Sequence, residues 1–118
     1  MKILLTGATG FISKKLIQEL LNKDFELSTI LRNRADHFPS KVKQFVVGDF
    51  TRDINYSNAL IGIDCVIHLA GKAHVIDKNK DSVLDEFRLI NTDLTLNLAK
   101  QAVDSGVNRF VFRIFNLV

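Results

Sequence analysis

The residues whose types and spacing could do chemistry begin with Thr6–Ser13, which reads TGATGFIS. An apolar run precedes this stretch and a helical pattern follows it, so it lies where a strand ends and a helix opens. Gly7 allows a tight turn, and Gly10 lets bare backbone approach a pyrophosphate that the helix N-terminus attracts. The third small position is Ser13 in place of glycine. The loop predicts a dinucleotide site, and the alternative is a plain glycine turn in an α/β sheet.

A second candidate group is the arginine pair in Leu31-Arg32-Asn33-Arg34. In dinucleotide-binding folds an acidic residue after the second strand binds the ribose hydroxyls of NAD, whereas an arginine accommodates the 2′-phosphate of NADP. No acidic residue occurs here before Asp36. Because a guanidinium can bind a phosphate bidentately, Arg32 favours NADP over NAD. The alternative is that both arginines project into water.

Cys65, His68 and His74 are the residues that could suggest a metal ion or a nucleophile. Residues three apart on a strand point to opposite sides of a sheet, so Cys65 and His68 are not expected to act together. We interpret Cys65 as a small buried hydrophobe and His68 as a strand residue near the cofactor loop. We expect no metal site. A phosphate-binding P-loop is excluded because Ala73 follows Gly71-Lys72 where serine or threonine is required.

The elements that must position these groups alternate between strand and helix. Short apolar runs predict strands, and apolar residues spaced by three and four predict helices. Such alternation implies βαβ units with right-handed crossovers. We expect one α/β domain over residues 1–118, a truncated Rossmann-like doubly wound parallel sheet of about five strands in the order 3-2-1-4-5 with flanking helices. The predicted strands are residues 2–6, 26–31, 44–47, 64–69 and 109–115, the predicted helices 11–23 and 81–105, and a weaker helix or turn covers 53–60.

Composition narrows the class of protein further. A chain of 118 residues with 47% hydrophobic residues and nine Phe can bury one core without disulfides or metals. The single cysteine favours a reducing, cytoplasmic setting, and no apolar run approaches the roughly 18 residues of a membrane span. The net charge of +3 is spread over scattered lysines and arginines. That pattern argues against nucleic-acid binding, which needs a concentrated basic face.

Four ordered motifs carry a resemblance to a known family. Thr6–Ile12, TGATGFI, resembles the nucleotide loop of the extended short-chain dehydrogenase/reductase superfamily, in particular nucleoside-diphosphate-sugar epimerases and dehydratases that include UDP-glucose 4-epimerase. Three later stretches are similar to the family's fourth strand, central helix and approach to the fifth strand. They are VIHLAG at 66–71, FRLINTDLTLNL at 87–98 and GVNRFVF at 106–112. The resemblance covers the chain up to about Phe112 and concerns the N-terminal part of the family's fold.

The resemblance implies a bound dinucleotide, NAD or NADP, and the family's epimerases usually keep NAD. By position in the motifs, Asp49 and Phe50 match residues beside the adenine, and Asn91 matches one near the nicotinamide side. Ala70 and Gly71 match the loop along the ribose and diphosphate. The candidate cofactor-binding residues are Gly7, Thr9, Gly10, Phe11, Ile12, Arg32, Asp49, Phe50, Leu69, Ala70, Gly71 and Asn91.

The residues that the resemblance requires for catalysis are not found in this sequence. The family uses a serine or threonine after the fifth strand and a Tyr-x-x-x-Lys pair for proton transfer. The only tyrosine is Tyr56, four residues before Leu60, and no serine follows Ser105. We therefore expect a cofactor-side fragment that binds NAD(P) without the catalytic set or the substrate domain. The alternatives are a structural, oligomerising remnant that has lost the ligand, and an active sugar-nucleotide epimerase, which would need its tyrosine and lysine from elsewhere.

The last predicted strand has consequences for assembly. Residues 109–115 would lie at the edge of the sheet with uncovered apolar faces, and such an edge seeks a partner. We expect a homodimer or higher oligomer through this strand, through the 81–105 helix, or through both. The enzymes that the chain resembles often dimerise through that helix.

Overall fold

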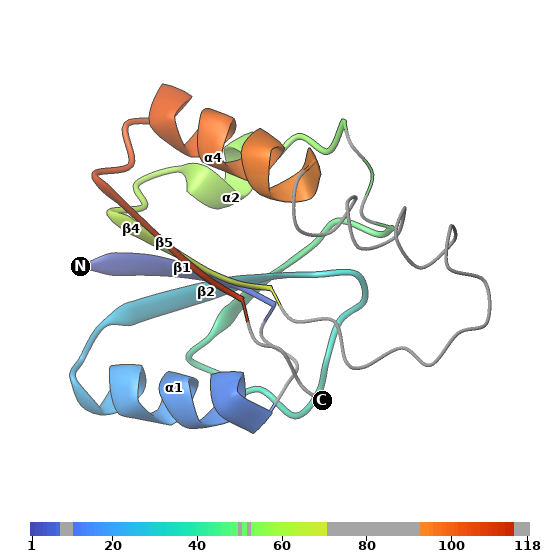
Figure 1. The fold of residues 1–118 in the computed structure, drawn as a ribbon. Coiled ribbons are helices and arrows are strands. Elements are labelled where there is room, and N and C mark those ends of the chain that lie inside the picture. Colours follow the sequence, from blue (N-terminus) through green and yellow to red (C-terminus); the bar gives the residue numbers. More distant parts are fainter. Residues whose placement is uncertain (8–10, 50, 52, 71–92, 115–118) are drawn as a thin grey trace.

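The computed structural model describes residues 1–7, 11–49, 51, 53–70 and 93–114. Its centre is a sheet in the order β3-β2-β1-β4-β5, and every neighbouring pair of strands is parallel. Helix α1 covers one face of this sheet, and helices α2 and α4 cover the other (Figure 1). The strands are β1 (Lys2–Thr6), β2 (Glu26–Leu31), β3 (Lys43–Val46), β4 (Cys65–Ala70) and β5 (Arg109–Ile114), and the helices are α1 (Phe11–Asn22), α2 (Ser57–Leu60) and α4 (Leu94–Asp104). The α/β class and the predicted strand order are confirmed.

The element boundaries follow the sequence pattern closely. Strands β1 and β2 have the predicted bounds, β3 and β4 are each displaced by one residue at both ends, and β5 ends one residue earlier than predicted. The weak signal at 53–60 corresponds to the single turn of α2. The predicted helix at 81–105 is confirmed over Leu94–Asp104, and residues 81–92 lie outside the described residues. No helix in the described ranges is long and apolar enough to cross a membrane.

Two apolar cores lie on opposite faces of the sheet. Neighbouring residues of a strand point to opposite faces, so Leu5 packs toward α1 with Ile17 while Leu4 packs toward α2 and α4 with Leu98. Leu4 and Leu5 are 0% and 1% exposed. Because helices cover both faces, β1 contains the continuous apolar run Ile3–Leu5, as buried parallel strands usually do.

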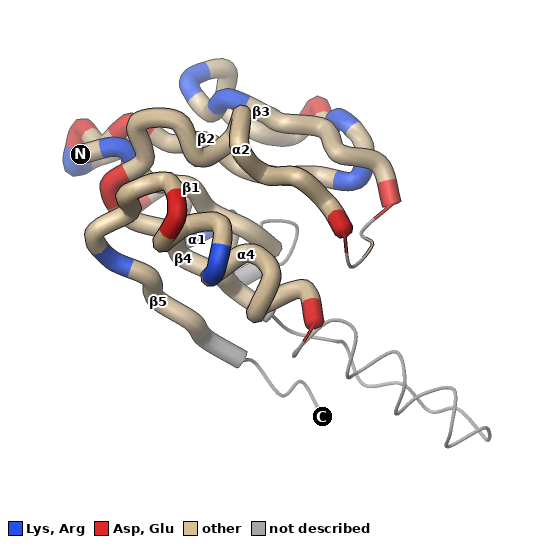
Figure 2. Tube along the Cα trace, turned by 90° about the horizontal axis from the view of Figure 1, so that it is seen from above, with Lys and Arg blue, Asp and Glu red and all other residues tan. Residues whose placement is uncertain are grey.

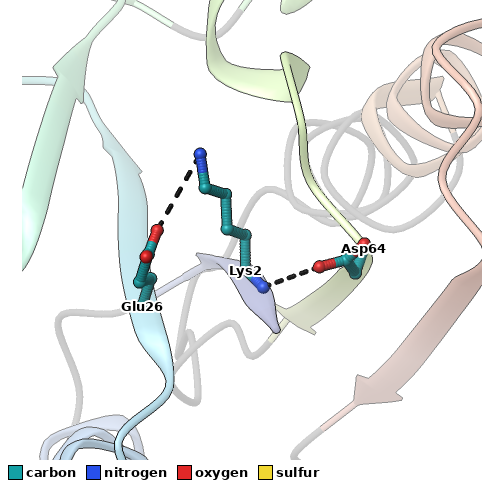
Figure 3. A network of polar contacts seen from close by, with 3 residues as sticks. All are labelled: Lys2, Glu26 and Asp64. Carbon is teal, nitrogen blue, oxygen red and sulfur yellow. Dashed lines mark hydrogen bonds and ion pairs between the residues drawn. The ribbon is translucent and has the colours of Figure 1, made fainter.

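The amino edge of the sheet is aligned mainly by backbone groups. The backbone N–H of Lys2 donates to Oδ2 of Asp64 at 2.8 Å (Figure 3), and the N–H of Asp64 donates to the carbonyl of Lys2 at 2.9 Å. The Nζ atom of Lys2 also lies 3.8 Å from Oε2 of Glu26. Both of these side chains are exposed, so their ion pair adds little to stability, and the hydrogen bonds hold β1 beside the start of β4.

Strand β5 forms one edge of the sheet, as predicted. Its Val111 and Phe112 are 42% and 38% exposed, which is high for large apolar side chains in a sheet. Strand β3 forms the other edge, where Val46 is also exposed. Both edges of the sheet therefore present apolar surface to solvent.

Charge is distributed over the described surface without a dominant sign. Figure 2 shows basic and acidic residues interspersed along the tube, with neither kind confined to one element. A nucleic-acid interface would require a concentrated basic face. The described part of the chain shows no such face.

Candidate functional site

Gly7 forms the turn at the carboxyl end of β1. Its φ angle is +74°, a left-handed conformation that glycine adopts without steric cost. A Cβ atom at this position would lie 1.8 Å from the carbonyl oxygen of Leu69 and 2.9 Å from its carbonyl carbon. The predicted tight turn is confirmed. The structure adds a second reason for glycine, which is the close approach of this turn to the backbone at the end of β4.

The parallel sheet brings several predicted site residues to one edge. Gly7 follows β1, Arg32 follows β2, Asp49 lies three residues after β3, and Leu69 and Ala70 end β4. The strand order reverses between β1 and β4, and doubly wound sheets bind their ligands outside the carboxyl ends of the strands at such a point. The Gly7–Leu69 contact lies at this point of reversal.

Helix α1 begins directly after the glycine loop. Phe11 and Ile12 form the first residues of this helix, so their backbone belongs to its N-terminal turn. Unpaired N–H groups in a first turn attract anions. Ser13, at the third small position of the loop pattern, is 2% exposed and therefore packs closely in the helix–sheet contact. This tight packing is the reason why a small residue is needed there.

Arg32 and Asp49 come together at the ends of β2 and β3. The Nε atom of Arg32 lies 3.8 Å from Oδ1 of Asp49, and the two side chains are 64% and 89% exposed. Both residues were predicted as cofactor contacts from their positions in the sequence, but their contact with each other was not predicted. An ion pair this exposed and this long is weak. Both charged groups are therefore accessible to a ligand.

Leu69 contributes backbone rather than side chain to the edge. Its side chain is 8% exposed and belongs to the core beneath α1. Its carbonyl group faces the Gly7 turn. Five of the predicted contacts lie outside the described residues, namely Thr9, Gly10, Phe50, Gly71 and Asn91.

His68 makes more contacts than the sequence analysis predicted. Its Nδ1 atom is hydrogen-bonded with Oγ1 of Thr6, and its Nε2 atom lies 3.0 Å from Oγ1 of Thr95. The ring stacks on Phe112, with centroids 5.3 Å apart. Burial lowers the pKa of His68 to about 4, so the imidazole is neutral near pH 7. The pairing with Thr6 follows from parallel strand register, whereas the contact with Thr95 depends on how α4 packs.

Cys65 and His68 lie on opposite faces of β4, as predicted. Cys65 is buried in the core beneath α1, and burial raises the pKa of its thiol. His68 faces α4 through Thr95. Within the described ranges, no group of three potential ligands is placed to hold a metal ion.

Tyr56 is a core residue. It is 4% exposed in the cluster beneath α2 and α4, and burial raises the pKa of its hydroxyl. Its backbone N–H donates to Oε1 of Gln101 at 2.7 Å. A tyrosine that acts as a catalytic acid or base needs access to substrate and a pKa near the working pH. Tyr56 has neither property.

A cavity lies at the other end of the sheet. This open cavity of about 600 Å³ is lined by residues at the amino ends of the strands, among them Lys2, Glu26 and Lys43. Ligands of doubly wound sheets bind at the carboxyl ends. The cavity is therefore separate from the candidate site.

A parallel sheet in the order 3-2-1-4-5, with a glycine turn at its point of reversal, defines a Rossmann-like dinucleotide-binding fold. The family model described as "NAD dependent epimerase/dehydratase family" matches residues 3–113. The chain belongs to this family.

Curated relatives have different names but share this region. The chain is 39% identical to the UDP-glucose 4-epimerase of Vibrio cholerae over 111 residues, which cover 93% of the chain and 33% of the relative. It is 31% identical to the 3-beta-hydroxysteroid dehydrogenase of Mycolicibacterium neoaurum over 127 residues, covering 99% of the chain and 32% of the relative. The chain therefore spans about a third of the length of these relatives.

Solved structures show the same architecture. MoeE5 in complex with UDP-glucose and NAD matches with a TM-score of 0.76 and 28% identity over 95% of this chain and 36% of that one. Yeast methylglyoxal/isovaleraldehyde reductase Gre2, complexed with NADPH, matches with a TM-score of 0.76 and 18% identity over the same shares. At that identity, Gre2 shows a common fold alone.

Proposed function

We propose that this chain binds a nicotinamide dinucleotide across the carboxyl edge of its sheet. The observation that carries the proposal is the Gly7 turn, whose bare backbone lies against the Leu69 carbonyl where a Cβ atom would not fit. This turn leads to the N-terminus of α1, which favours an anion such as a pyrophosphate. The bound NAD of MoeE5 and the bound NADPH of Gre2, two proteins of the same fold, support the proposal.

Each part of the edge has a proposed role. The glycine loop and first turn of α1 bind the pyrophosphate, the ends of β2 and β3 bind the adenosine, and the end of β4 borders the ribose and diphosphate. When bound, the nicotinamide supplies a hydride donor or acceptor. The proposed contacts are Gly7, Thr9, Gly10, Phe11 and Ile12 for the pyrophosphate, Arg32, Asp49 and Phe50 for the adenosine, Leu69, Ala70 and Gly71 beside the ribose and diphosphate, and Asn91 toward the nicotinamide.

We propose that NADP is bound in preference to NAD. The guanidinium of Arg32 is exposed at the end of β2, where the 2′ group of the adenosine ribose would lie. Its ion pair with Asp49 is long and solvated, so a doubly charged phosphate can replace it at little cost. Among the similar structures, MoeE5 has NAD and Gre2 has NADPH, so the preference rests on Arg32 itself.

The role of this region is proposed to be cofactor binding and orientation without catalysis. The named relatives are an epimerase and a hydroxysteroid dehydrogenase, yet they share this third of their length. Tyr56 is confined to the core, which supports the absence of a catalytic tyrosine from this part of the fold.

Calorimetric titration with NADP and NAD, with thermal melting alongside, tests the proposal. We expect saturable binding of both cofactors, tighter for NADP, and a melting temperature that rises with cofactor concentration. Gly10→Asp places a carboxylate in the predicted phosphate loop and should abolish binding, whereas Asn58→Asp adds the same charge on α2 and should leave it intact. No heat and no thermal shift at millimolar cofactor would overturn the proposal.

We also propose that the chain self-associates through β5, through α4, or through both. Val111 and Phe112 on β5 and Leu96 and Val103 on α4 are exposed apolar side chains that support this proposal. Light scattering at high micromolar concentration should show a dimer or larger species. Val111→Lys should shift it toward monomer without changing cofactor affinity, and a monomeric wild-type protein would refute self-association.

A further inference from the structure

His68 is the centre of a partly buried polar network that joins three elements. The strand register places Thr6 of β1, His68 of β4 and Phe112 of β5 side by side. The two ring nitrogens contact the hydroxyls of Thr6 and Thr95, and Thr95 lies in the first turn of α4. The imidazole of His68 therefore links β1, which leads into the glycine loop, to helix α4.

The protonation state of the ring determines which hydrogen bonds it donates and which it accepts. A neutral imidazole has one N–H donor and one acceptor nitrogen, so one threonine donates to the ring while the other accepts from it. Burial keeps the ring neutral near pH 7, because it lowers the pKa to about 4. Phe112 stacks on the ring with an interplanar angle of 16°, which restricts its rotation. A single tautomer in a single orientation is therefore expected.

The network also adjoins the closest backbone contact of the candidate site. Thr6 directly precedes Gly7, and His68 directly precedes Leu69, whose carbonyl oxygen faces the Gly7 turn. The hydrogen bond between Thr6 and His68 thus joins the two chain segments that form this contact. A shift of the ring would move both sides of the turn relative to each other.

We propose that His68 is a positioning residue that holds the Gly7 turn, the end of β4 and the start of α4 in the arrangement that binds the dinucleotide. The effect on cofactor rests on the proposed function, whereas the effect on the Gly7 turn does not. His68 acts through Thr6 and Thr95.

Thr29 provides an internal comparison. It is a fully buried threonine of β2 whose Oγ1 atom has no hydrogen-bond partner in the described part of the chain. Replacing it with valine removes a hydroxyl without breaking such a bond, so Thr29→Val is a matched control for Thr95→Val. Thr95→Ser keeps the hydroxyl and serves as the rescue variant.

The experiment measures NADP affinity by calorimetry and the His68 ring nitrogens by ¹⁵N NMR in the wild type and these three variants. In the wild type the ring should show one tautomer that does not titrate between pH 8 and 5.5. Thr95→Val should produce a mixture of tautomers, move the backbone resonances of Gly7, and weaken NADP binding about tenfold. Thr95→Ser and Thr29→Val should bind NADP within twofold of the wild type.

The outcomes separate this proposal from the proposed function. If Thr95→Val lowers the melting temperature while binding NADP like the wild type, His68 has a structural role only and the proposal is overturned. If the wild type binds no dinucleotide, the proposed function fails, and the NMR measurements decide the positioning role by themselves. In that case displaced Gly7 resonances in Thr95→Val support it, and unchanged ones overturn it.

Discussion

The two sides of the candidate site are held by different forces. On the β1–β4 side, the Gly7 turn lies against a backbone carbonyl, and the half-buried His68 is hydrogen-bonded at both ring nitrogens. On the β2–β3 side, Arg32 and Asp49 form an exposed ion pair 3.8 Å long. Close packing and partly buried hydrogen bonds require particular distances and orientations. The attraction between exposed charges is screened by salt, over about 10 Å at 0.1 M ionic strength. The β1–β4 side therefore fixes the geometry of the site, and the β2–β3 side is suited to discriminate between ligands of different charge.

The largest effect is expected from placing a side chain in the Gly7 turn, on the closely packed β1–β4 side. Gly7→Ala should lower the free energy of unfolding by about 3 kcal/mol or more, because the new Cβ atom meets the Leu69 carbonyl in addition to the strain of a positive φ. Urea denaturation measures the change.

Gly106→Ala is the matched control for that substitution. Gly106 has a φ of +82°, yet nothing lies within 4 Å of a Cβ built there. It should lose only about 1 kcal/mol, the cost of the left-handed conformation. Equal losses in the two variants would show that the contact with Leu69 is unimportant.

The next effect is a dependence of stability on pH that originates from His68, on the β1–β4 side. The pKa of His68 falls from its ordinary value of 6.5 to about 4 in the folded protein, so the unfolded chain binds more protons between these values. The folded protein therefore has its full stability with respect to His68 above pH 6.5, where the ring is neutral in both states, and loses stability as the pH falls toward 4. The size of this loss is on the order of 3 kcal/mol.

Urea denaturation between pH 7.5 and 4.5 measures this dependence. The described contacts of the ring are two hydroxyls and two phenyl rings, from Thr6, Thr95, Phe110 and Phe112. His68→Gln should flatten the pH dependence, and the same change at the exposed His37 should preserve it. A pH dependence that persists in His68→Gln would assign it to other groups.

A smaller effect is expected on the charged side. Arg32→Ala should weaken NADP binding about tenfold and change NAD binding less than twofold, because it removes the cation proposed for the 2′-phosphate. Titrations at low and high salt should show that the wild-type preference decreases as salt screens the charges. Lys23→Ala, which removes an exposed cation directly after the last residue of α1, is the control. Equal weakening for both cofactors would contradict the proposed selectivity.

The smallest effect is expected from removing either of the two exposed ion pairs, one at each end of the strands. The Lys2–Glu26 pair has the same 3.8 Å separation as the Arg32–Asp49 pair. Glu26→Gln and Asp49→Asn should each change the free energy of unfolding by less than about 0.5 kcal/mol. Urea denaturation at two salt concentrations checks this. A larger loss from Asp49→Asn would mean that the charged side also holds the fold.

Local sequence features predicted the strands and the glycine turn well. Ile3, Leu4 and Leu5 form an apolar run that is buried on both faces, which is why β1 could be placed to the residue. Gly7 was predictable because few residues other than glycine tolerate a tight turn between strand and helix. The exposed apolar edge at Val111 and Phe112 likewise followed from the predicted strand order.

Contacts between distant segments were beyond prediction. Leu69 was named as a cofactor contact by motif position, but only the fold shows that its carbonyl excludes a side chain from Gly7. The meeting of Arg32 and Asp49 depends on how the loops after β2 and β3 fold back. The role of His68 depends on Thr95, which is 27 residues away.

By itself, the sequence determined the alternation of strands and helices, the parallel sheet with its strand order, and the position of the glycine turn. The alternation and the glycine turn depend on periodicity and on the conformational freedom of single residues, which are local properties, whereas the parallel strand order was predicted from the βαβ connections and from the resemblance to a known fold. The tertiary structure alone decided which groups meet at the carboxyl edge and which of them are buried. Burial and distance depend on the packing of the whole sheet against its helices, and they keep the half-buried His68 neutral while Arg32 stays exposed to solvent.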